Sequence, residues 1–116
     1  AARDGGGGVS YDIWLTADLG GPEPIRIDGE TWNYTSNCSR MWREAGADLA
    51  EFDGKQAGEC AEVLRAGLVA LLGEPDKYRA MNPENGWGDY DSMLKALLAL
   101  LASFERAPRA TVRVWR

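Results

Sequence analysis

Two short segments carry most of the side chains that could bind a ligand. The first, Asn82–Asp91, combines asparagine, glycine, tryptophan and aspartate just before a long apolar pattern. The second, Trp32–Asn37, also ends near a predicted helix start. Helix N-termini attract anions, and aromatic rings stack on sugars or bases. If both helix starts lie at one edge, we expect a small-ligand site lined by Asn33, Tyr34, Ser36, Asn37, Asn85, Trp87 and Asp89.

The same residues also have a structural interpretation. Asn85-Gly86 is a turn signal with positive φ, and Asp89 or Asp91 can cap a helix that opens with Tyr90. Asparagine side chains often satisfy turn backbones, and Trp87 can fill the space between helices. The two aspartates would suit a divalent metal only with help from another loop. Capping is the simpler account, so we expect no metal and no other cofactor.

The residue inventory gives little support to catalysis. The chain has no histidine, which removes the commonest general base and the usual partner of a serine or cysteine nucleophile. Cys38, near a helix start, could have a lowered pKa, whereas Cys60 falls on an apolar stripe. With no secretion signal, we expect both cysteines to be free thiols. The sequence therefore favours a protein that is not an enzyme, and catalysis by carboxylates or Cys38 is the third alternative.

Composition narrows the class of protein further. The 116 residues are 45% hydrophobic and 27% charged, which fits one globular domain. The formal charge of −5 argues against general nucleic-acid binding, although four arginines make the C-terminal end locally basic. No apolar run approaches the roughly 20 residues of a membrane span. We expect a cytoplasmic protein with a flexible glycine-rich leader over residues 1–8 and a single domain over residues 9–116.

Alternating polar and apolar residues predict the strands. Residues 9–19 alternate, with Trp14 on the polar side, and residues 25–28 resume the alternation after a Gly-Pro turn. Residues 32–34 are either a further short strand or a loop. Residues 111–116 alternate again and predict the last strand, which we expect to lie beside the first.

The first two predicted helices follow from start and stop residues and from the periodicity of apolar residues. A short helix covers residues 38–45 and stops at Gly46. Asp53, with Gln56 three residues later, resembles a capping box and opens a longer helix that ends at Gly73. We expect this helix to bury one stripe: Ala57, Cys60, Leu64, Leu68 and Leu71.

A brief helical turn over residues 74–81 precedes the last helix, which runs from Tyr90 toward Pro108. Its main predicted stripe is Tyr90, Leu94, Leu97, Leu101 and Phe104, broadened by Met93, Leu98 and Leu100. The element order is therefore β-β-α-α-α-β. We predict a small α+β domain with an antiparallel or mixed sheet and helices packed on one face.

The face of the sheet turned away from the helices is a second candidate site. Tryptophan and arginine dominate binding hot spots, so Trp14, Arg26, Arg113 and Trp115 predict an interface with a protein partner or a second copy of the chain. The alternative is cross-strand pairing that only stabilises a solvent-facing sheet. We expect Trp14 to pair with Trp115 on this face if the end strands adjoin. The side chains expected to point away from the helices are those of Asp12, Trp14, Thr16, Arg26, Asp28, Thr111, Arg113 and Trp115.

Four segments resemble a set of short bacterial and phage-borne proteins that carry no assigned function: Ser10–Ile13, Asn33–Asn37, Asn85–Asp91 and Ala110–Val114. The resemblance implies one domain and an accessory or phage-related protein rather than a metabolic enzyme. Our leading hypothesis is a small non-catalytic binding or protein-interaction module. The alternative is a sensor or sequestering protein for a small anionic or sugar-containing ligand. Neither hypothesis involves a membrane.

Overall fold

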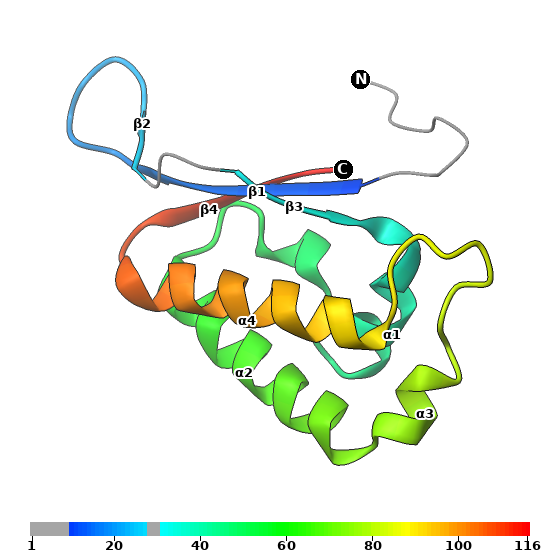
Figure 1. The fold of residues 1–116 in the computed structure, drawn as a ribbon. Helices are drawn as coiled ribbons and strands as arrows, with labels where there is room; N and C mark the ends of the chain where they lie inside the picture. Colours follow the sequence, from blue (N-terminus) through cyan, green and yellow to red (C-terminus); the bar gives the residue numbers. More distant parts are fainter. Residues whose placement is uncertain (1–9, 28–30) are drawn as a thin grey trace.

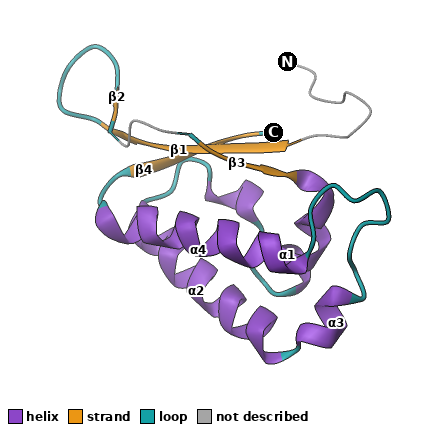
Figure 2. Ribbon diagram, in the orientation of Figure 1, coloured by secondary structure: helices purple, strands orange, loops and turns teal. Residues whose placement is uncertain are grey.

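The computed structural model describes residues 10–27 and 31–116. The predicted leader over residues 1–8 and the position of Asp28 lie outside the described residues. Four antiparallel strands form one sheet, and the helices cover one of its faces (Figures 1 and 2). The predicted α+β class and the one-sided packing are therefore confirmed. None of the helices in the described ranges is both long enough and apolar enough to cross a lipid bilayer.

Strand β1 (Ser10–Ala17) is the centre of the sheet. One of its edges pairs with β4 (Thr111–Trp115), so the first and last strands are neighbours as predicted. Its other edge pairs with β2 (Ile25–Arg26) and then with β3 (Trp32–Thr35). The segment around Trp32 is thus a strand and not a loop.

The alternation of β1 places Tyr11, Ile13 and Leu15 on the inner face, where each is at most 2% exposed. They pack into a single hydrophobic core together with the helices. Tyr11 meets the fully buried Trp42 edge to face, with ring centroids 5.3 Å apart. Aromatic side chains bury large areas, so this contact fixes the first helix under the sheet.

The helices confirm the predicted order and stop signals. Gly46 ends the first helix with a φ of 94°, and the predicted stripe of the second helix is fully buried. Besides the four α-helices, two 3-10 turns connect the elements. Their bounds are η1 (Ser36–Cys38), α1 (Ser39–Glu44), η2 (Leu49–Phe52), α2 (Ala57–Gly73), α3 (Pro75–Arg79) and α4 (Tyr90–Arg106).

The buried stripe of α4 differs from the predicted one. Leu94 and Leu101 are only half-buried and Leu98 is 49% exposed, whereas Met93 and Leu100 are buried. The helix contacts β3 on one side and α2 on the other. These two neighbours set its rotation, and the hydrophobic pattern alone does not reveal them.

The predicted capping box at Asp53 is wrong. The carboxylate of Asp53 accepts a hydrogen bond from the backbone N–H of Val114 at 2.9 Å and pairs with Arg113 at 3.1 Å. Gln56 occupies the N-cap position of α2 without a capping hydrogen bond from its side chain. An edge strand presents backbone N–H groups that no neighbouring strand pairs with. One of these groups of β4 donates to the Asp53 carboxylate, which is therefore not available to cap α2.

Gly67 allows α2 to pack closely against the segment that follows α1. A Cβ atom at this position would lie 2.7 Å from the Cβ of Ala47, closer than carbon atoms pack. The absence of a side chain in the middle of α2 is therefore a packing requirement, although glycine weakens a helix by about 1 kcal/mol relative to alanine.

We expect Gly67→Val to lower the free energy of unfolding by about 1–3 kcal/mol, because overpacking forces the backbone of two elements apart. The matched control is Gly73→Val, at the other end of α2, where a Cβ meets no atom within 4 Å. The control should change stability by less than about 0.5 kcal/mol. Urea unfolding followed by circular dichroism measures both, and equal effects would contradict the close contact.

Candidate functional site

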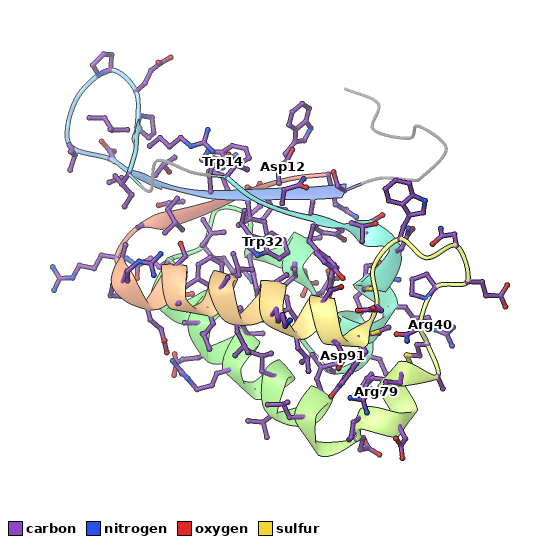
Figure 3. The ribbon with its side chains drawn as sticks, in the orientation of Figure 1. Asp12, Trp14, Trp32, Arg40, Arg79 and Asp91 are labelled. Atoms are coloured by element: carbon purple, nitrogen blue, oxygen red, sulfur yellow. The ribbon has the colours of Figure 1, made fainter. Side chains whose placement is uncertain are left out.

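The outer face of the sheet, the one turned away from the helices, carries the first candidate site. Asp12 and Trp14 lie on this side of the sheet, whereas Trp32 lies between the sheet and α4 (Figure 3). Along β4, Val112 is buried and Val114 packs against the core, so Arg113 and Trp115 alternate to the outer face. We call Trp14, Arg26, Arg113 and Trp115 the interaction face.

The register of the sheet corrects one expectation about this face. Trp14 lies opposite Arg113, and Trp115 lies opposite Asp12. The predicted cross-strand pair of Trp14 with Trp115 is therefore wrong. The two indoles occupy diagonal positions, which in antiparallel sheets are about 7–8 Å apart and within reach of aromatic side chains.

Neighbouring charges hold the side chains of the interaction face in place. The guanidinium of Arg26 lies over the ring of Trp14, 5.3 Å from its centroid, and donates a hydrogen bond to Thr31. Arg113 is held by Asp53 as described above. Trp115 is 45% exposed, which is unusual for so large an apolar side chain.

The outer edge of β4 is covered, so the face and not this edge is the accessible surface. The N–H of Gly54 donates to the carbonyl of Val112, and the N–H of Val112 donates to the carbonyl of Lys55, both at 2.8 Å. A bridge between Gln56 and Thr111 continues this pairing. Covered edges prevent the sheet from adding a further strand.

The two polar-aromatic segments meet, which is the condition for the predicted shared site. Gly86 and Gly88 both have positive φ, and a Cβ at Gly88 would lie 2.7 Å from Thr35 and 2.9 Å from the hydroxyl of Tyr34. Asn37 donates a hydrogen bond to the carbonyl of Trp87 at 3.4 Å. The loop before α4 therefore packs directly on the end of β3.

Most polar groups at this junction bind one another. Asp89 caps α4 and forms a capping box with Ser92, whose hydroxyl lies 2.6 Å from that of Tyr34. Burial raises the pKa of Tyr34 to about 12, and hydrogen bonds from Ser92 lower the pKa of Asp89. Asn85 accepts from the N–H of Trp87 at 2.9 Å, which closes the turn. The capping prediction is confirmed, and a role of these residues in ligand binding stays a prediction.

The side chains of Asn33 and Ser36 lie apart from this junction, and the indole of Trp87 is exposed although its backbone belongs to the junction. Asn33 is on the outer face, where its amide donates to the carboxylate of Asp12 at 2.6 Å. Ser36 lines a shallow hollow of about 450 Å³ together with Tyr11, Ser39, Arg43 and Arg116. Trp87 is 59% exposed, so the expectation that it fills the space between helices is wrong. Its position follows from the tight turn, which directs the indole outward.

The two carboxylates at the start of α4, Asp89 and Asp91, have different partners. Asp91 pairs with Arg79 of α3 at 3.1 Å, while Asp89 caps the helix (Figure 3). Within residues 10–27 and 31–116, no group of three or more histidine, cysteine, aspartate or glutamate side chains is arranged to hold a metal ion.

Both cysteines are free and buried. Burial raises the pKa of Cys38, which corrects the expectation of a lowered value at a helix start. The thiol of Cys38 lies 3.8 Å from the hydroxyl of Tyr34. Burial also raises the pKa of Cys60 to about 11. A thiol that stays protonated is a poor nucleophile, so neither side chain is activated for covalent chemistry.

A groove that no sequence pattern predicted runs between the sheet and the C-terminal half of α4. Two adjoining cavities of about 190 and 280 Å³ share Leu15, Ser103 and Arg106 as lining residues. We call them together the α4 groove. Trp32 lines it and anchors β3 to the helix, since its indole N–H donates to the carbonyl of Ala96 at 2.7 Å. Only the contact between distant elements creates this concavity.

No protein-family model matches the sequence, and neither a curated protein nor a solved structure matches it.

We expect Gly88→Ala to destabilise the domain more than Gly86→Ala. Both changes place a Cβ on a left-handed backbone, which costs about 1–2 kcal/mol. Only the Cβ at Gly88 meets Thr35 and Tyr34; the one at Gly86 meets no atom within 4 Å. The additional loss for Gly88→Ala should be about 1–3 kcal/mol in urea unfolding. Equal losses would contradict the packing of the loop on β3.

We also expect the free energy of unfolding to fall as the pH rises from about 9 to about 11. The ordinary thiol pKa is 9.0 and that of folded Cys60 is about 11. Between these values the folded state keeps a proton that the unfolded state has lost, so alkaline pH favours unfolding. Urea unfolding from neutral pH to pH 11 should show a shallower decline for Cys60→Ala, and parallel curves would contradict the shift.

Proposed function

We propose that this domain is a non-catalytic protein-interaction module and that it binds its partner through the interaction face. One observation carries the proposal: the helices cover only the inner face of the sheet, and the uncovered face holds two tryptophans flanked by arginines. Tryptophan and arginine are the residues most enriched among binding hot spots. The resemblance to short bacterial and phage-borne proteins supports an accessory role of this kind.

The arrangement of the arginines supports a partner surface that combines apolar and acidic groups. Arg26 is exposed and already lies against Trp14, so a carboxylate could bind it while the partner covers the indole. Asp53 pairs with Arg113, so Arg26 is the arginine of this face that can meet an acidic group of the partner. Charge complementarity gives specificity and a faster association rate.

The two tryptophans differ in what they contribute. Trp14 is half-buried and held by Arg26, so it is ordered before a partner arrives. Trp115, near the end of β4, is 45% exposed and gains more burial on binding. A rigid aromatic side chain loses little conformational entropy when it is covered, so Trp115 is the better position to test.

The test is affinity capture by the immobilised domain from its source cells, with bound proteins quantified for each variant. Trp115→Ala should reduce capture of the partner at least about tenfold, because truncating a hot-spot residue costs about 2 kcal/mol or more. If the partner is a second copy, light scattering over a concentration series should show a dimer that Trp115→Ala lacks.

The matched control is Val69→Ala, which removes an apolar side chain that is 68% exposed on α2, outside the interaction face. This variant should capture the same partner as the wild type. Thermal unfolding of both variants checks that the fold is retained. Identical capture by wild type and Trp115→Ala, or a monomer with no captured protein, would contradict the proposal.

A further inference from the structure

We propose that the α4 groove binds a small amphipathic carboxylate, that is, a short acyl chain that ends in a carboxylate. This site goes beyond the proposed interaction module, because most of its lining comes from α4 and the inner face of the sheet; of the interaction face, Trp14 alone borders it. Three features support it: an apolar wall, two polar groups where the cavities adjoin and a volume that suits a short chain.

The walls of the groove come from both layers of the fold. Ile13 and Leu15 of β1 line one part of the groove, and Leu100 and Phe104 of α4 line another part. All four side chains are at most 2% exposed, so they lie beneath the floor as part of the fixed core, and the half-buried Trp32 supplies the accessible apolar wall. Trp32 adds an aromatic wall whose N–H is already bonded to α4, so it faces a ligand with its ring. Small-molecule sites are concave and mostly apolar in this way.

Two polar groups converge where the cavities adjoin. The hydroxyl of Ser103 and the guanidinium of Arg106 line both cavities. In the part of the chain that the structure describes, Arg106 has no ion pair and Ser103 has no side-chain hydrogen bond. These groups can therefore donate to a ligand oxygen, and a guanidinium matches the two oxygens of a carboxylate.

The charges around Arg106 favour an anion where the two cavities adjoin. Glu105 is next to Arg106 in the chain, but its carboxylate pairs with Arg65 at 2.5 Å. It therefore does not neutralise Arg106. The net negative charge of the chain would attract a cationic amphiphile, but the positive charge of Arg106 would repel its head group at the groove itself. The geometry thus selects an anionic head group.

The volume limits the length of the apolar part. An apolar cavity of about 150 Å³ holds a benzene molecule, so cavities of about 190 and 280 Å³ suit a chain of about six to eight carbons. Hexanoate and octanoate are therefore the probes. Octylammonium carries the same chain with the opposite charge, and octanol carries no charge.

The experiment titrates these four compounds into ¹⁵N-labelled protein and follows the indole N–H resonance of Trp32, assigned with Trp32→Phe. Octanoate should shift this resonance and bind about sixteenfold more tightly than hexanoate, since it has two more methylenes and each buried methylene adds about fourfold. Arg106→Gln should weaken octanoate about tenfold and leave octanol unchanged. The matched control Arg109→Gln removes an exposed arginine three residues further on and should change octanoate affinity by less than about twofold.

A second variant tests the groove without removing its charge. Ala99 is an exposed lining residue, so Ala99→Phe can block the groove with little change to the core. It should weaken both octanoate and octanol, with thermal unfolding as the check on folding. Octylammonium binding as tightly as octanoate, Arg106→Gln binding octanoate like the wild type, or Ala99→Phe leaving both affinities unchanged would overturn the proposal. Shifts confined to indoles other than Trp32, or no binding at millimolar concentrations, would also overturn it.

Discussion

The rest of the structure depends on β1, which is paired on both edges and buried on one face only. Its inner residues Tyr11, Ile13 and Leu15 reach the core, and the alternate residues necessarily point the other way. A one-residue slip of the strand would exchange these two sets. The pairing of β1 with β4, β3 and β2 fixes the register. The same constraint therefore builds the core and presents the outer tryptophan.

At the junction between β3 and α4, polar residues of types that can take part in catalysis instead stabilise the fold by binding one another. Tyr34, Asp89 and Ser92 form one hydrogen-bonded group, and Gly88 lets the loop approach it. Buried or partly buried polar groups need partners, and here they find them in one another. Such a cluster orders the start of α4. This helix in turn forms one wall of the α4 groove, so the junction positions a site in which it takes no part.

Local signals in the sequence predicted most of the fold. The alternation of β1 and the cap at Asp89 operate within a few residues, and both are confirmed. The wrong predictions concern residues whose partners are distant in the sequence. Asp53 has the sequence of a helix cap, but the edge of β4, about 60 residues away, takes its carboxylate. The pairing of Trp14 depends on register, which alternation alone does not determine. The α4 groove depends on how two layers meet, and no local pattern encodes that.

The interaction face and the α4 groove share β1. Trp14 belongs to the interaction face and also borders the groove, whereas its buried neighbours Ile13 and Leu15 line the groove only. A strand held by hydrogen bonds on both edges and packed against a dense core resists displacement on either side. Truncating Trp115 therefore removes contacts of the outer face only, and truncating Arg106 removes contacts of the groove only. Trp115 lines neither cavity of the groove and Arg106 lies outside the interaction face, so variants at these two positions assign the two surfaces separately.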